Sequence, residues 1–103
     1  MTVADGERSI WPGEVTRAME GRVPSSCRVW MFGSALVRRR PKDLDLLITY
    51  RPGYEVDALD VKSGILAVAR ARQWPALDIV ILAHSDQIRF PQAHRALQLH
   101  GEA

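Results

Sequence analysis

The feature that most constrains the fold is a helical segment enclosed by two apolar, strand-like segments. Residues 43–50 (DLDLLITY) and 76–82 (ALDIVIL) are rich in β-branched and aliphatic residues, a composition typical of strands. Between them, residues 55–73 carry an apolar face at helical spacing, made by Ala58, Val61, Ile65 and Val68. A helix that joins two strands of one sheet makes a crossover, so we expect these strands to be parallel neighbours.

Shorter elements complete an α/β layer arrangement around this unit. Pro12 indicates the first turn of a short helix that stops at Gly21. Residues 27–32 (CRVWMF) predict a strand, and residues 85–101 predict a helical tail. The length of 103 residues fits one domain, with a core at about 12–84 followed by that tail. We expect α-β-α-β-α-β order and a small sheet flanked by helices.

Composition and charge narrow the class of protein. Cys27 is the single cysteine, which excludes an internal disulfide and fits a reducing compartment. The first twenty residues carry six charges, so they contain no signal-peptide core, and no apolar run reaches the length of a membrane span. A cytoplasmic protein is therefore expected. The net charge of +2 is too mild to indicate nucleic-acid binding by itself.

Three aspartates stand in apolar strand segments where a charge is unusual. Asp43 and Asp45 are two positions apart in a strand, so their side chains point to the same face. Asp78 lies in the run 76–82, whose apolar composition predicts a central strand buried on both faces. If the two strands are neighbours, the three carboxylates converge and suit Mg²⁺ or Mn²⁺. The alternatives are a cap residue for Asp43 and a solvent-facing edge charge for Asp78.

A second group of residues suited to phosphate precedes this pair. Gly33 and Ser34 end the first strand, where a glycine lets a backbone turn approach a ligand closely. Backbone N–H groups of such a turn, together with the Ser34 hydroxyl, can hold an anion. The connection to Asp43 contains no acid and four basic residues, namely Arg38, Arg39, Arg40 and Lys42. The alternative for these basic residues is a plain solvated loop.

The order and spacing of these motifs resemble the minimal nucleotidyltransferases of the DNA polymerase beta superfamily. Gly33-Ser34, then eight residues, then the Asp43-x-Asp45 strand and a later Asp78 in an apolar strand follow that family's pattern. The resemblance covers residues 12–84. It implies the nucleotidyltransferase fold, an α-β-α-β-α-β core with a three-stranded mixed sheet flanked by helices.

The resemblance also implies an activity, namely transfer of a nucleoside monophosphate from an NTP, with ATP expected, to a hydroxyl of a protein or RNA acceptor. Asp43, Asp45 and Asp78 would be the catalytic, metal-binding carboxylates for two Mg²⁺ or Mn²⁺ ions. The nucleotide phosphates would be held by Gly33, Ser34, Arg38, Arg39 and Lys42. Members of the family occur with small helical HEPN-type toxins, so an antitoxin role and a protein partner, or a second copy of the chain, are expected.

Two alternatives to an enzyme remain open. One is an inactive antitoxin of the same fold that acts by contact, because the Gly-Ser to Asp-x-Asp spacing is shorter than usual in the family and Ala35 stands where many members have arginine. The other is an arginine-rich binder of single-stranded nucleic acid.

His84 follows the third strand, either near the site or as a cap or surface residue, whereas His94 and His100 are expected on the surface. Three residues, Trp11, Trp30 and Trp74, are expected to be core or interface anchors.

Overall fold

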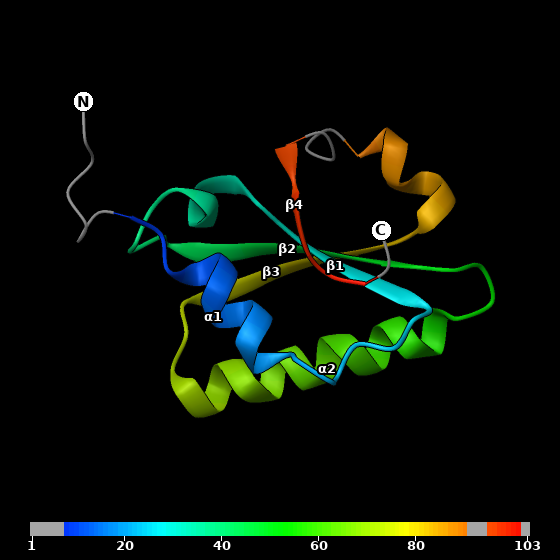
Figure 1. Cartoon of the computed structure of the whole chain (residues 1–103), viewed down its shortest axis with the longest axis horizontal. Coiled ribbons are helices and arrows are strands. Elements are labelled where there is room, and N and C mark those ends of the chain that lie inside the picture. Colours follow the sequence, from blue (N-terminus) through cyan, green and yellow to red (C-terminus); the bar gives the residue numbers. More distant parts are fainter. Residues whose placement is uncertain (1–7, 91–94, 102–103) are drawn as a thin grey trace.

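The computed structural model describes residues 8–90 and 95–101 (Figure 1). Its elements in chain order are α1 (Trp11–Ala18), β1 (Cys27–Phe32), the 3₁₀ segment η2 (Gly33–Leu36), β2 (Asp43–Tyr50), α2 (Glu55–Arg72), β3 (Ala76–Ala83), the 3₁₀ segment η3 (His84–Arg89) and β4 (Leu97–His100). The predicted strands and the long helix are confirmed to within one residue at each end. In the described part of the chain, no helix is long and apolar enough to cross a membrane.

The strands form one mixed sheet in the order β3-β2-β1-β4. β2 and β3 are parallel, as the crossover through α2 predicts, and β1 is antiparallel to both β2 and β4. The fold is therefore mixed α+β. The expectation of three strands is wrong, because β4 adds a fourth strand on the outer side of β1.

The predicted helical tail over residues 85–101 is also wrong. Its first part is η3, a 3₁₀ segment, and its last part is the strand β4. The sequence of β4 has too few residues to show a period, so the open edge of β1 decides its conformation by offering backbone partners. Two residues of the predicted tail, Pro91 and His94, lie outside the described residues.

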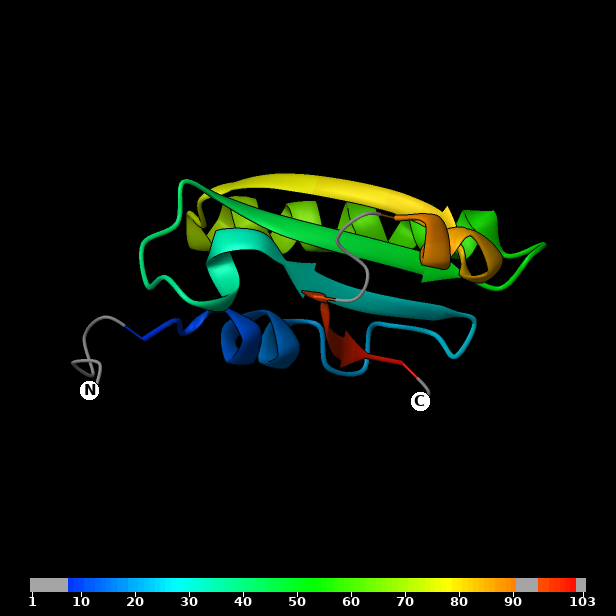
Figure 2. The ribbon, with the colours of Figure 1, turned by 90° about the horizontal axis from the view of Figure 1, so that it is seen from above.

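The hydrophobic core lies between one face of the sheet and the two α-helices (Figures 1 and 2). Side chains alternate along a strand, so the even-numbered aliphatic residues of β2 enter this core and are fully buried. Each such aliphatic side chain contributes about 1.5–3 kcal/mol of burial free energy. The core-facing residues of β2 are Leu44, Leu46 and Ile48. The odd-numbered residues, including Asp43 and Asp45, consequently project from the opposite face.

The third strand is an edge strand, not the central strand that its apolar composition predicts. Its residues are only partly buried or exposed. α2 lies under one face of β3, and η3 contacts β3 only where the strand ends (Figure 2).

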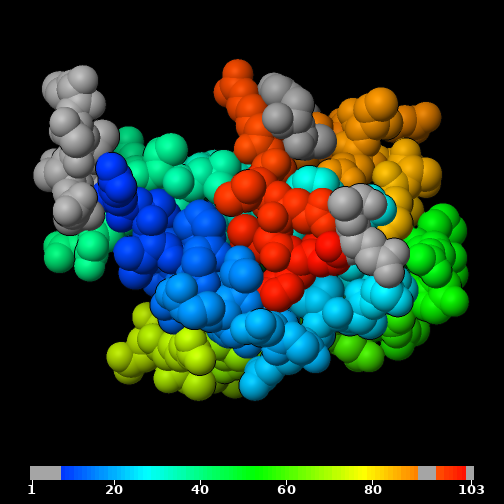
Figure 3. Space-filling view, viewed as in Figure 1, coloured from blue at the N-terminus to red at the C-terminus, as the bar shows by residue number. Residues whose placement is uncertain are grey.

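The C-terminal strand is held against α1 by a histidine. The Nε2–H group of His100 donates to the Thr16 carbonyl, with 2.7 Å between nitrogen and oxygen, so this side chain is partly buried and not the surface residue expected. Figure 3 shows β4 packed between α1 and the start of β1. At Gly101, where φ is +109°, a Cβ would lie 2.8 Å from the Cys27 carbonyl oxygen. Glycine therefore lets the backbone after β4 lie close to β1.

Candidate functional site

The three aspartates lie together on the sheet face that the α-helices leave uncovered. Asp45 of β2 is in register with Asp78 of the parallel strand β3 and with Phe32 at the end of β1. Asp43 is two residues earlier on β2, so it shares the same face. Asp43, Asp45 and Asp78, which we call the carboxylate trio, thus lie where β1 ends and where β2 and β3 begin.

The members of the carboxylate trio differ in their exposure to solvent. Asp43 and Asp45 are partly buried, and Asp43 is the first residue of β2 and not a cap before it. Asp78 is exposed on an edge strand, which is the alternative considered for it. Its register with Asp45 still brings the two carboxylates onto neighbouring positions. The predicted pairing of the two strands is therefore confirmed, with Asp78 at the exposed edge of the sheet.

Negative charge in the trio is not neutralised by neighbouring cations. Burial raises the pKa of Asp45 above its ordinary value of 3.8, and the charges of Asp43 and Asp78 raise it further. Within residues 8–90 and 95–101, no basic side chain forms an ion pair with the trio, since both ion pairs belong to Glu14. The ionised form of the Asp45 carboxylate is therefore destabilised in this structure.

The Asp45 carboxylate lies against the bare backbone of Gly33. The φ angle of Gly33 is +76°, a conformation that glycine adopts without strain. A Cβ at this position would overlap Oδ2 of Asp45 and lie 3.2 Å from its Cγ. Glycine is required here both by the backbone angle and by the approach of the carboxylate. The sequence predicts a glycine turn at this point, but the atom that it contacts depends on the β1–β2 register.

The turn after Gly33 is fixed by contacts that the sequence reasoning missed. The Ser34 carbonyl accepts from the N–H groups of Val37 and Arg38, at 3.1 and 2.8 Å. From outside the turn, the Ser9 hydroxyl donates to the Ala35 carbonyl, and the Trp11 indole N–H donates to the Arg39 carbonyl at 2.8 Å. No local sequence pattern signals these two contacts, because they join residues 26 and 28 positions apart along the chain.

The basic residues of the loop are exposed to solvent and stand apart from the trio. These residues are Arg38, Arg39, Arg40 and Lys42. Their side chains make no ion pair within the described ranges, which matches the solvated-loop alternative. They remain candidates for phosphate binding because the Arg38 N–H donates to the Ser34 carbonyl and the other basic residues follow closely along the chain.

His84 lies at the other end of β3 and does not belong to the trio. It comes directly after β3, six residues beyond Asp78, which corresponds to about 20 Å along the strand. Burial lowers the pKa of His84, and the charges of Arg28 and Arg51 lower it further. The possibility that His84 lies near the site is therefore wrong, because β3 continues in one direction away from Asp78.

The chemistry of the trio fits a hard divalent cation, but the side chains are not arranged around one. Carboxylate oxygens are the ligands that Mg²⁺ and Mn²⁺ prefer, and the unpaired negative charge at Asp45 would be relieved by a cation. In the described part of the chain, no three side chains of the His, Cys, Asp or Glu type are placed to hold one metal ion. As they stand, the three carboxylates are therefore not arranged around one metal ion.

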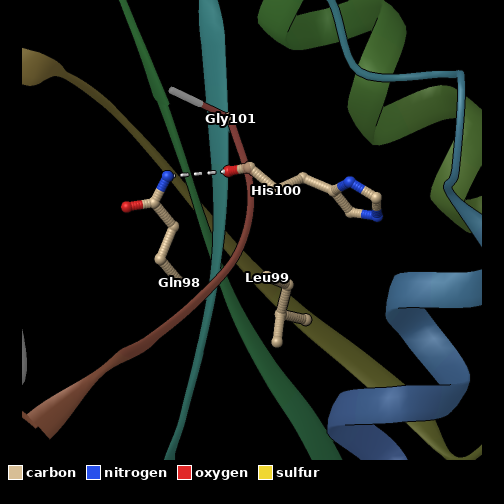
Figure 4. Close-up of a pocket in the computed structure, with 4 residues that line it drawn as sticks. All are labelled: Gln98, Leu99, His100 and Gly101. Carbon is tan, nitrogen blue, oxygen red and sulfur yellow. Dashed lines mark hydrogen bonds between the residues drawn. The ribbon is translucent and has the colours of Figure 1, made fainter. Parts of the chain in front are cut away.

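Two cavities of the described structure lie away from the trio. One, of about 300 Å³, is lined by the β4 residues Gln98 to His100 and by Gly101 (Figure 4). Gln98 crosses it to donate to the His100 carbonyl at 3.2 Å. Another, of about 380 Å³, lies at η3 and is lined by residues that include Leu82 and Phe90.

The raised pKa of Asp45 predicts a pH dependence of stability. As the pH falls through the raised value toward 3.8, the folded protein takes up this proton before the unfolded chain does. The contribution of Asp45 to the free energy of unfolding should therefore increase on acidification. Urea unfolding of the wild type and of Asp45→Asn at several pH values measures this. The Asn variant should be the more stable at neutral pH, with a difference that shrinks at lower pH; a constant difference would contradict the prediction.

Comparison with known proteins does not assign the chain to a family. No protein-family model matches it, and neither the curated proteins nor the solved structures contain a match.

Proposed function

We propose that the protein is a metal-dependent nucleotidyltransferase with the nucleotidyltransferase fold. The observation that carries the proposal is the Asp45 carboxylate, which lies against Gly33 and is flanked by Asp43 and Asp78 with no cation paired to it. A site built for structure alone would pair or neutralise such charges. The parallel β2–β3 pair and the antiparallel β1 agree with the mixed sheet that the resemblance implies.

Each residue of the site has a role in this proposal. Asp43 and Asp45 would hold both divalent ions, and Asp78 would hold the ion beside the attacking hydroxyl. When bound, the ions supply charge stabilisation and lower the pKa of that hydroxyl. Asp78 is exposed at the sheet edge, so it can accept the hydroxyl proton and release it to solvent.

The turn after β1 would hold the phosphates of the NTP. The first N–H groups of a helical turn have no partner within the turn, so those at the start of η2 can donate to phosphate oxygens. The Ser34 hydroxyl adds a donor, and the guanidinium groups of Arg38 and Arg39, together with Lys42, offset the charge of the departing pyrophosphate. ATP is the expected nucleotide, and a protein or RNA hydroxyl is the expected acceptor.

Nucleotide binding tests this function without knowledge of the acceptor. Calorimetric titration of a non-hydrolysable ATP analogue should show binding in Mg²⁺ and none after chelation. Asp43→Asn should weaken binding by at least about tenfold, because a carboxylate that would hold the ions is lost. Asp60→Asn, on the exposed side of α2, is the matched control and should bind as the wild type does.

One observation favours a second function, which is inhibition of a partner protein by contact alone. The carboxylates of the trio are not arranged around a metal, as an inactive antitoxin would allow. In that case the Asp43→Asn variant would bind the partner, for example a small helical toxin, as well as the wild type does. Absence of nucleotide binding by the folded wild type at millimolar concentration would favour this function over the enzyme.

A further inference from the structure

The outer edge of β3 is a long, unprotected strand edge. Among the described residues no strand pairs with β3 on the side away from β2, so a row of backbone N–H and C=O groups along eight residues faces outward. Natural proteins shorten, bulge or charge such edges. The opposite edge, β4, has four residues, and its pairing with β1 is shifted by an irregularity. β3 has one charged residue, Asp78, in its whole length.

Exposed leucines lie on the flank of α2 next to this edge. The Ser26 hydroxyl donates to Asp57 at 2.6 Å, and the nearest atom to a Cβ at Gly64 would belong to Met19, so this flank of α2 faces β1 and α1. At 100° per residue, Leu59 and Leu66 are about 140–200° around the helix from Asp57 and Gly64. They therefore face outward past β3, and their exposed fractions are 54% and 41%.

Charges along α2 favour an antiparallel copy of the same helix. Its first turn carries Glu55 and Asp57, and its last turn carries Arg70 and Arg72. In an antiparallel pair centred between Lys62 and Ser63, Leu59 is opposite Leu66 of the partner subunit. The same register places Glu55 opposite Arg70 of the partner subunit. One alignment therefore matches both the apolar and the charged positions.

From these observations we infer that a second copy of this chain docks along β3 about a two-fold axis. The β3 strands of the two copies pair antiparallel and join the sheets into one, which satisfies the outward N–H and C=O groups. α2 runs back along β3 (Figures 1 and 2). The same axis would therefore bring the two α2 helices side by side with their leucines in contact. Such an interface is self-complementary, as a two-fold dimer requires.

Sedimentation analysis with a matched pair of variants tests this interface. The wild type should sediment at twice the 11.6 kDa of one chain and dissociate on dilution. Leu66→Glu should weaken the dimer by at least about 100-fold, because it introduces two like charges into the apolar contact. Val56→Glu is the control. The Val56 side chain is more exposed than that of Leu66, at 69%, but it points about 80° away from Leu66 around the helix axis. This variant should leave the dimer intact.

Charge reversal identifies the antiparallel register. Glu55→Arg and Arg70→Glu should each weaken the dimer by about tenfold, since each places like charges opposite one another at two symmetric positions. The double variant restores opposite charges and should recover the wild-type affinity, although it reverses both charges relative to the helix dipole. A merely unstable helix would not be rescued in this way.

Three results would overturn the proposal: a wild type that is monomeric at every concentration, equal effects of Leu66→Glu and Val56→Glu, or no rescue in the double charge reversal.

Hydrogen exchange gives an independent check on the strand. The amides of β3 should exchange more slowly at high than at low protein concentration, whereas those of β4 should not change. These measurements involve no nucleotide, so they succeed or fail independently of the proposed transferase activity.

Discussion

Asp45→Asn is expected to abolish nucleotidyl transfer and, at the same time, to stabilise the fold at neutral pH. The carboxylate is the central member of the trio, and its neighbours Asp43 and Asp78 make its charge unfavourable. Asparagine keeps the shape and removes the charge, so the repulsion disappears together with the proposed metal ligand. Metal-dependent nucleotide binding should fall by at least about 100-fold, because even residues behind a metal ligand cost up to that factor.

Two measurements on the same variant separate function from stability. Calorimetric titration gives the nucleotide affinity in Mg²⁺, and urea unfolding gives the free energy of unfolding. A loss of both binding and stability would mean that Asp45 is needed for the fold, which contradicts the raised pKa. Unchanged binding with increased stability would remove Asp45 from the nucleotide site and favour a protein that acts by contact.

Gly33→Ala is expected to disable the site more than it destabilises the fold. The positive φ angle alone costs a residue with a side chain about 1–2 kcal/mol. The new methyl group would also occupy the position of Asp45 Oδ2, which is the far end of a side chain that can rotate. The carboxylate should therefore turn away, and metal-dependent nucleotide binding should fall by about tenfold or more, as expected when a metal-site contact is disturbed.

Gly21→Ala provides a control with the same backbone angle. Gly21 also has a φ of +76°, but a Cβ there would meet no atom within 4 Å. Both variants should lose about 1–2 kcal/mol of unfolding free energy, whereas only Gly33→Ala should lose nucleotide binding. Equal nucleotide binding by the two variants would show that the position of the Asp45 carboxylate against Gly33 does not matter for the ligand.

Much of the carboxylate trio could be predicted from local pattern. Alternation along a strand puts Asp43 and Asp45 on one face whatever the strand packs against. The helix between β2 and β3 makes the two strands parallel, so Asp78 is brought to the same end of the sheet. The raised pKa of Asp45 follows from this arrangement and from burial. The orientation of each carboxylate is a rotamer choice, and the sequence pattern contains no information on it.

The sequence by itself determined the elements that have a local signature. α2 is within a residue of its expected bounds because apolar positions recur at about 3.6 residues, and β1, β2 and β3 are so because they are short runs rich in β-branched, aliphatic or aromatic residues. Tertiary structure decided the rest. The tail forms a strand at Leu97–His100 because β1 had an open edge. β3 is an edge strand because nothing in the described chain pairs with its outer side. Gly33 contacts Asp45 because of the β1–β2 register. Each of these depends on contacts between residues far apart in sequence, which local periodicity does not encode.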